Sequence, residues 1–218
     1  MSPTSTTGMT FEKSADSLER LIMVARHIFT QALEFVDLLE SDEQLTCDSK
    51  YLPGSTIGKH LRHARDHYTL LLDALESPPP RLVNYDVRLR NTPMESSRAA
   101  AKQAMKDTIK RLEKLIPNRA LVDERLTLNA VTPHPQVFET TFGRELWFCE
   151  LHAIHHWSMI RVIAGELVWF YCLPVLDYGL TWSALDSQNI KITDGSFGFA
   201  PSTLVFKGND AALAQSRY

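Results

Sequence analysis

Residues 145–163, ELWFCELHAIHHWSMIRVI, decide the fold of this chain. Large apolar side chains are spread around the whole circle of a helix built from the stretch, so this helix is apolar on nearly every side and belongs inside a domain. His152 and His156 are four residues apart and lie on one face of that helix, within reach of a single metal ion. A buried imidazole without a partner costs roughly 1–3 kcal/mol. A shared metal ion removes that cost if another helix supplies a further ligand.

The length and composition of the chain fit one domain with a sizeable core. The chain has 218 residues, of which 44% are hydrophobic. A net charge of -3 and a pI of about 6.2 give no electrostatic footprint for nucleic acid. No apolar run reaches membrane-spanning length, and the polar N-terminal residues lack the apolar centre of a signal peptide. We therefore expect a cytoplasmic protein whose partners include neither nucleic acid nor a membrane.

Apolar residues recur at helical spacing in three further segments, residues 16–39, 55–76 and 94–116. With the helix expected at residues 142–167 they predict a mainly all-α four-helix bundle. Alternating apolar and polar residues within 121–141 predict a small β-hairpin before the fourth helix.

Two further polar residues of the fourth helix need a role. Glu145 lies about 10 Å along the helix axis from His152, so we expect an ion pair or a hydrogen bond to the hairpin rather than binding to the same ion. His155 is rotated away from His152 and His156 on the helix, and we expect it to orient a neighbour or to pack against the first helix.

The second predicted helix carries a row of three histidines, His60, His63 and His67. A partly exposed polar edge beside the apolar stripe is the simplest explanation of this row. The histidine pair on the fourth helix favours metal binding instead, because ligands from facing helices converge in the core of a bundle. On a helical wheel His60 lies nearest the apolar arc and His63 farthest from it. Spacing alone therefore leaves open which histidine of the row is a ligand.

The segment STIGKHLRHARDHY, residues 55–68, resembles the second-helix signature of the DinB/YfiT superfamily of metal-binding four-helix bundles. In that signature a Ser or Thr, an isoleucine and a glycine precede a ligand histidine, and an aspartate follows it three residues later. The matching positions here are Ile57, Gly58, His63 and Asp66. The resemblance covers about residues 18–206 apart from one insertion, and it implies the bundle fold.

The resemblance also implies a site made of three histidines. The other two ligands of the family lie four residues apart on its fourth helix, as the pair in residues 145–163 does. The implied metal ligands are His63, His152 and His156. The residues left as alternative ligands, or as second-shell donors that orient the ligands, are His60, His67, Asp66 and His155.

The run SPPPRLVNYDVRLRNTP, residues 77–93, contains too many prolines for a helix. A similar tract occurs in a bacterial subset of DinB-like proteins. A solvated charged loop is one interpretation of its charges. The other is that the loop crosses the mouth of the metal site, where Tyr85, Arg88 and Arg90 bind an anionic group of a substrate.

Three neutral imidazoles suit zinc or nickel, with iron, manganese or copper as alternatives, and they leave a coordination position open. DinB-like relatives include thiol-dependent transferases and an isomerase that uses a low-molecular-weight thiol. The resemblance therefore implies a transferase or hydrolase that activates a small thiol or water for attack on a small-molecule electrophile. A non-catalytic metal-binding or stress-response module is the second hypothesis, and a bundle whose histidines pair with carboxylates is the third. Relatives often pair through bundle faces, so a homodimer is a further expectation.

The predicted domain spans residues 14–206, between a disordered arm at 1–13 and a tail at 207–218. Within it, residues 168–188, VWFYCLPVLDYGLTWSALDSQ, are aromatic-rich and aperiodic, and the resemblance does not account for them. They fit two hypotheses, a lid over the pocket and a translated intron. A valine codon at 168 can begin with a splice donor and a glutamine codon at 188 can end with an acceptor. On either hypothesis we expect this segment to be poorly packed.

Overall fold

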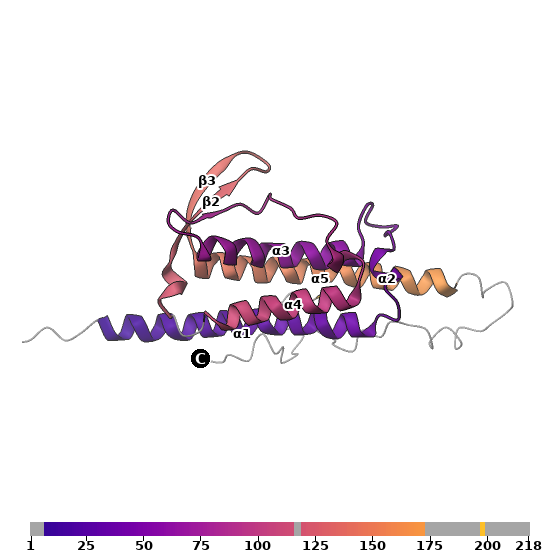
Figure 1. The fold of residues 1–218 in the computed structure, drawn as a ribbon, viewed down its shortest axis with the longest axis horizontal. Helices are drawn as coiled ribbons and strands as arrows, with labels where there is room; N and C mark the ends of the chain where they lie inside the picture. The colour runs from indigo at the N-terminus through magenta and orange to yellow at the C-terminus, as the bar shows by residue number, and fades with distance from the viewer. Residues whose placement is uncertain (1–6, 116–118, 173–196, 199–218) are drawn as a thin grey trace, which may run out of the picture.

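Four long helices dominate the computed structural model, which describes residues 7–115, 119–172 and 197–198 (Figure 1). The long helices are α1 (Thr7–Leu38), α3 (Ile57–Glu76), α4 (Arg98–Glu113) and α5 (Phe142–Cys172). The short elements are α2 (Glu43–Thr46), β1 (Leu82–Val83), η1 (Pro93–Glu95), η2 (Arg119–Asp123), β2 (Arg125–Ala130) and β3 (Gln136–Thr141). This mainly helical fold, with its strands before α5, confirms the predicted fold class.

The core lies between α5 and its neighbours. Figure 1 shows α3 and α5 side by side, with α1 and α4 packed against them. Trp157 of α5 is fully buried, and its indole Nε1 donates a hydrogen bond to the backbone oxygen of Ile28 in α1 at 3.1 Å. One face of α5 is nevertheless open, because Trp147, Leu151 and Val162 are 50%, 40% and 45% exposed. The helix expected inside the domain is therefore buried on its other sides and exposed on this face.

Phe197, which follows α5 in the chain, adds to the same core. Its ring stacks on Phe35 with a centroid distance of 5.1 Å and on Trp157 at 6.1 Å. Its backbone oxygen accepts a hydrogen bond from Nη1 of Arg161 at 2.7 Å, and Ser158 Oγ donates to the backbone oxygen of the next residue at 2.5 Å. These contacts hold the end of the domain against α1 and α5.

The helix ends differ from the predicted ones where the helix leaves the core. α1 begins at Thr7, inside the predicted N-terminal arm, whereas apolar spacing placed its start near residue 16. α4 begins at Arg98 after the short η1, not at residue 94. Apolar periodicity marks only the part of a helix that packs on a core, so it misses polar turns at either end. Thr56 caps the N-terminus of α3, because its side chain accepts from the backbone N–H of Lys59 at 3.1 Å.

The predicted hairpin is confirmed. β2 and β3 pair antiparallel over their whole length, from Arg125 opposite Thr141 to Ala130 opposite Gln136. β1 adds a third strand in parallel, with Leu82 opposite Thr127. The sequence did not predict β1, because two residues in a proline-rich run carry no periodicity. Its pairing ties the start of the 84–92 loop to the hairpin.

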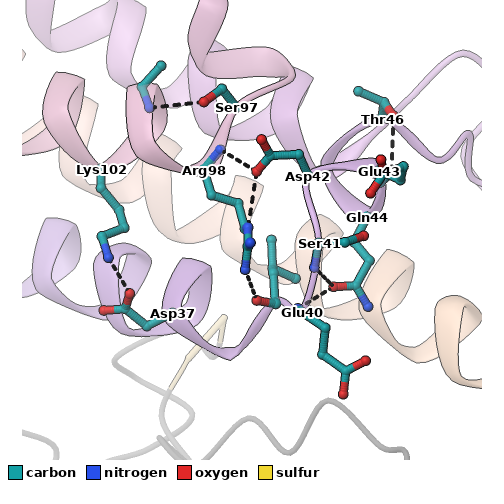
Figure 2. Close-up of polar contacts among 12 residues, drawn as sticks. Asp37, Glu40, Ser41, Asp42, Glu43, Gln44, Thr46, Ser97, Arg98 and Lys102 are labelled. Carbon is teal, nitrogen blue, oxygen red and sulfur yellow. Dashed lines mark hydrogen bonds and ion pairs between the residues drawn. The ribbon is translucent and has the colours of Figure 1, made fainter.

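A polar corner joins the end of α1 to the start of α4, and Figure 2 shows its contacts. Asp42 accepts hydrogen bonds from both the backbone N–H and Nε of Arg98, each at 3.0 Å. The same guanidinium donates to the backbone oxygen of Leu39, and Lys102 of α4 pairs with Asp37 of α1. This corner fixes α4 against α1 on the side of the bundle that does not carry the site.

The first turn of α3 packs directly on η1. A Cβ atom at Gly58 would lie 2.0 Å from the backbone oxygen of Glu95 and 2.7 Å from its carbonyl carbon. Only a residue without a side chain allows this approach. The glycine of the sequence signature therefore sets the distance between the histidine-bearing helix and the segment that follows the loop.

Part of the 168–188 segment belongs to α5, which continues as a helix to Cys172 beyond the end predicted at residue 167. Residues 173–188 lie outside the described residues, and so does the prediction that they are poorly packed. The lid and intron hypotheses therefore stay predictions, as do the domain boundaries near residues 13 and 206.

Candidate metal centre

Helices α3 and α5 bring two rows of histidines face to face. The row on α3 is His60, His63 and His67, and the pair on α5 is His152 and His156. His67 and His156 are buried, with 4% and 8% of their surface exposed, and the other three are half-buried. The predicted convergence of two distant histidine segments is therefore present in the fold.

Three of these imidazoles meet through their Nε2 atoms. Nε2 of His152 lies 3.3 Å from Nε2 of His63 and 3.1 Å from Nε2 of His156. The three ring planes are nearly perpendicular to one another, at 78° between His63 and His152, 73° between His152 and His156, and 83° between His63 and His156. The lone pairs of imidazoles lie in their ring planes, so rings arranged in this way can direct them to a common point.

These distances fit a tetrahedral metal site. Zinc–nitrogen bonds of about 2.0–2.1 Å at tetrahedral angles separate the ligand nitrogens by roughly 3.3–3.4 Å. Two of the three edges, the 3.3 and 3.1 Å that join Nε2 of His152 to Nε2 of His63 and of His156, are close to that length. The residues therefore fit the metal that the resemblance implies, and the ligand role of His63, His152 and His156 stays a prediction.

A second set of three histidines shares two members with the first. One ligand atom each from His63, His67 and His152 can be chosen so that all lie within 4.8 Å of one another. The ring of His67, however, lies over that of His152 at 3.8 Å and only 33° from parallel. Lone pairs of two overlying rings with this tilt run more nearly side by side than those of the perpendicular rings. We therefore prefer the set with His156, and His67 remains the alternative ligand.

Two of the ligand candidates, His67 and His156, have a partner at Nδ1. Nδ1 of His67 lies 3.1 Å from the backbone oxygen of His63 and must donate to it, since a carbonyl oxygen only accepts. Nδ1 of His156 lies 2.7 Å from Nδ1 of His60. Hydrogen bonds of this kind commonly orient metal-binding imidazoles and leave Nε2 free for the ion.

Burial keeps the cluster neutral. Desolvation is the main cause that lowers the pKa of His63 and of His152 to about 3 and that of His156 to about 2, and neighbouring histidines lower them further. Burial likewise lowers the pKa of His60 to about 4. A neutral imidazole is the form that binds a metal. The structure thus presents the ligand candidates in that form at pH 7.

Asp66 and His155, both named as second-shell candidates, do not touch a Nε2 atom of the centre. Asp66 is buried and accepts from Nη1 of Arg62 at 3.0 Å, while Nε of Arg62 donates to Glu95 at 3.2 Å. Asp66 therefore ties α3 to η1 through Arg62. The exposed ring of His155 lies beside the ring of His156, at 5.4 Å between centroids.

The expected link between Glu145 and the hairpin is confirmed. Its carboxylate is fully buried and accepts from Thr140 Oγ1 at 2.8 Å in β3. It also accepts from the hydroxyl of Tyr85 at 3.0 Å. The Tyr85 ring stacks on His67, with centroids 4.8 Å apart and planes 12° from parallel. Tyr85 therefore has its hydroxyl directed away from the centre and its ring against a histidine, and its role in substrate binding stays a prediction.

A cavity of about 470 Å³ opens beside the centre. Its lining combines histidines of the centre with basic residues of the loop and of α3. The lining residues are Gly54, Ser55, Lys59, His60, Arg62, His63, Arg88, Arg90, Asn91, Glu95 and His156. The loop arginines thus lie at the mouth of the centre, where the sequence placed them, although their role is untested.

Lys59 and Glu95 were not predicted as part of this site. Lys59 lies four residues before His63 on α3, so its place on the same helix face could have been read from the spacing. Glu95 arrives through the contact between η1 and the first turn of α3. No local sequence pattern predicts the contact between η1 and α3.

In the part of the chain that the structure describes, no helix combines the length and the apolar character that crossing a membrane requires.

Comparison with known proteins agrees with the geometry of the centre. The chain is 29% identical over 198 residues to a protein of Rhizopus delemar named FK506-binding protein 5. That match covers 89% of this chain but 40% of the relative, so the chain spans less than half of the relative's length. No solved structure matches the chain. The family model of the DinB superfamily matches residues 24–160, more than half of the sequence. The chain therefore belongs to the DinB superfamily.

Proposed function

We propose that this chain is a metal-dependent enzyme that activates a small thiol, or water, for attack on an electrophilic small molecule. The observation that carries the proposal is the meeting of three Nε2 atoms, from His63, His152 and His156, beside an open cavity. Zinc and nickel are the first candidates for the metal, and iron, copper and manganese follow.

The local contacts of the histidines support metal binding over a purely structural role. Buried histidines that only stabilise a fold usually have a carboxylate or backbone partner. In the described residues, none of the five histidines of the facing rows contacts a carboxylate, and Nε2 of His152 contacts Nε2 of both His63 and His156. Neutral imidazoles gathered in this way gain little from each other, but a shared cation would satisfy all three lone pairs.

The metal and the residues around it have different roles in the proposed reaction. A bound divalent metal would act as a Lewis acid that lowers the pKa of a thiol or of water. The cavity admits both reactants, and the guanidinium groups of Arg88 and Arg90 orient an anionic substrate by charge and by paired hydrogen bonds. In a transfer reaction the thiol sulfur forms a bond to the substrate, the leaving group departs with its electron pair, and the thiol proton passes to solvent.

Cobalt substitution tests the proposal. Cobalt-loaded protein is titrated with low-molecular-weight thiols while the near-ultraviolet absorption is followed. We expect a new sulfur-to-cobalt absorption that is absent in a His156→Ala variant and retained in the exposed control His155→Ala. A spectrum that no biological thiol changes contradicts thiol activation. Turnover of ester or amide substrates without any thiol would then support the hydrolase form of the proposal.

A non-catalytic metal-binding module is the second candidate. The observation in its favour is that the chain spans 40% of the relative named FK506-binding protein 5, so the matching region there is joined to additional sequence. A module of this kind binds cobalt with the same three histidines but shows neither a thiol absorption nor turnover. The same titration therefore separates the two candidates.

A further inference from the structure

The 84–92 loop is pinned at both ends next to the cavity. Near its start, the carboxylate of Asp86 accepts from Thr132 Oγ1 at 2.6 Å and from the backbone N–H of Val131 at 2.8 Å. Near its end, Glu95 accepts from the backbone N–H of Thr92 at 3.2 Å. These contacts anchor the backbone of the segment at both ends beside the cavity.

Residues 87–90 alternate between apolar and basic side chains, and only the basic ones line the cavity. Arg88 and Arg90 line the cavity, whereas Val87 and Leu89 do not line it and are 51% and 62% exposed. All four of these residues are exposed to solvent. The two guanidinium groups lie along the open cavity, and the two apolar side chains lie outside it.

Within the described residues, neither loop arginine has a carboxylate partner. Arg62 in the wall of the same cavity contrasts with them, because it is paired with both Asp66 and Glu95. Lys59 makes only a loose contact of 3.9 Å with Asp48, and it donates to the backbone oxygen of Gly54. The histidines of the wall are neutral, so the cavity holds a surplus of positive charge.

The residue after Arg90 has a left-handed backbone conformation. Asn91 adopts a φ of 58° and lines the cavity. Asparagine tolerates this left-handed conformation better than most residues, but it remains uncommon outside glycine. The conformation turns the chain sharply after Arg90 and directs it back toward η1.

We infer that the cavity is a subsite for a doubly charged oxyanionic group, which Arg88 and Arg90 bind from the loop and Lys59 binds from α3. A phosphate monoester and a pair of neighbouring carboxylates share this chemistry, since the planar guanidinium pairs with either in a bidentate way. The inference rests on the proposed function in one respect: the molecule that carries the anionic group would be the substrate or the thiol of the proposed reaction. A volume of about 470 Å³ exceeds what one such group fills, so the rest of the molecule extends toward His63 and His156.

Calorimetric titration of the full chain tests the inference, on metal-loaded protein and on protein treated with a chelator. The probes are inorganic phosphate, succinate and acetate at constant ionic strength. We expect phosphate or succinate to bind at least about tenfold more tightly than acetate, and the tighter of the two identifies the source of the charge. The double variant Arg88→Gln with Arg90→Gln should lose this binding, and the double lysine variant should retain part of it.

The control is Arg125→Gln, which removes one positive charge by the same substitution at an exposed residue of β2 that does not line the cavity. Equal binding by the double glutamine variant and this control overturns the inference, as does the absence of saturable binding by both dianions. Metal content is measured on the same samples. Arginine-dependent anion binding by a protein that holds no metal would support the inference and contradict the proposed function. Metal binding without anion binding would contradict the inference and leave the proposed function in place.

Discussion

Nδ1 of His60 lies 2.7 Å from Nδ1 of His156, so one of these two imidazoles donates a proton to the other. When Nε2 of His156 binds a metal, its proton resides on Nδ1, and His60 is then the acceptor. Nε2 of His60 carries the remaining proton, and this buried atom has no partner among the described residues. His60 is therefore placed to fix the tautomer and the ring direction of His156.

We expect His60→Leu to weaken metal binding by about 10- to 100-fold without abolishing it, because a positioning partner is lost while the three Nε2 donors remain. His60→Asn should recover part of the affinity, since its side-chain oxygen can accept near the former Nδ1. Competition with a chromophoric chelator measures both constants. Unchanged affinity in the leucine variant would remove this role, and complete loss of metal would make His60 a direct ligand.

Gly58→Ala should destabilise the fold by roughly 1–3 kcal/mol, the usual cost of overpacking. The new Cβ would lie 2.0 Å from the backbone oxygen of Glu95, and backbone cannot move aside as a side chain does. Gly165→Ala is the matched control, because a Cβ there meets nothing within 4 Å. We expect the control to gain up to about 1 kcal/mol from helix propensity. Urea unfolding measures the free energy of unfolding of both variants and of the unchanged protein. A Gly58→Ala variant as stable as the unchanged protein would show that η1 can move away from α3.

Metal-free protein should lose stability as the pH falls below about 6.5, the pKa of an unperturbed imidazole. Burial lowers the pKa of His152 to about 3 and that of His156 to about 2. Between these values and 6.5 the unfolded chain binds protons that the folded chain does not, so protonation favours unfolding. His156→Phe should flatten the dependence of the urea midpoint on pH between 7 and 5, whereas the exposed variant His155→Ala should keep it. Parallel profiles in all three proteins would contradict a buried neutral cluster.

The sequence predicts those parts of the fold that a local pattern encodes. Helical spacing and the hairpin alternation predict α3, α5 and the β2–β3 pair, because burial of one face imposes its period on the residues. β1 and η1 carry no such pattern, since each is only two or three residues long and exists through contacts with distant segments. The ends of α1 and α5 were misplaced for a related reason, as their outer turns extend past the apolar stripe.

The candidate site, like the fold, was predictable only where a local pattern encodes it. Motif and spacing grouped His63, His152 and His156, and in the structure Nε2 of His152 lies within 3.3 Å of Nε2 of each of the other two. The sequence did not predict that His60 would face His156 or that Tyr85 would stack on His67. Both contacts depend on how two elements are rotated against each other, and spacing within one helix does not contain that information.

The metal content of protein purified without a histidine tag tests the central claim most directly. We expect close to one divalent ion per chain, retained in His155→Ala and lost in His63→Ala, His152→Ala and His156→Ala. A wild-type protein that holds no metal, even after incubation with zinc or nickel, would contradict the account. Loss of metal in His67→Ala together with full retention in His156→Ala would show that the ion binds to the other set of three histidines.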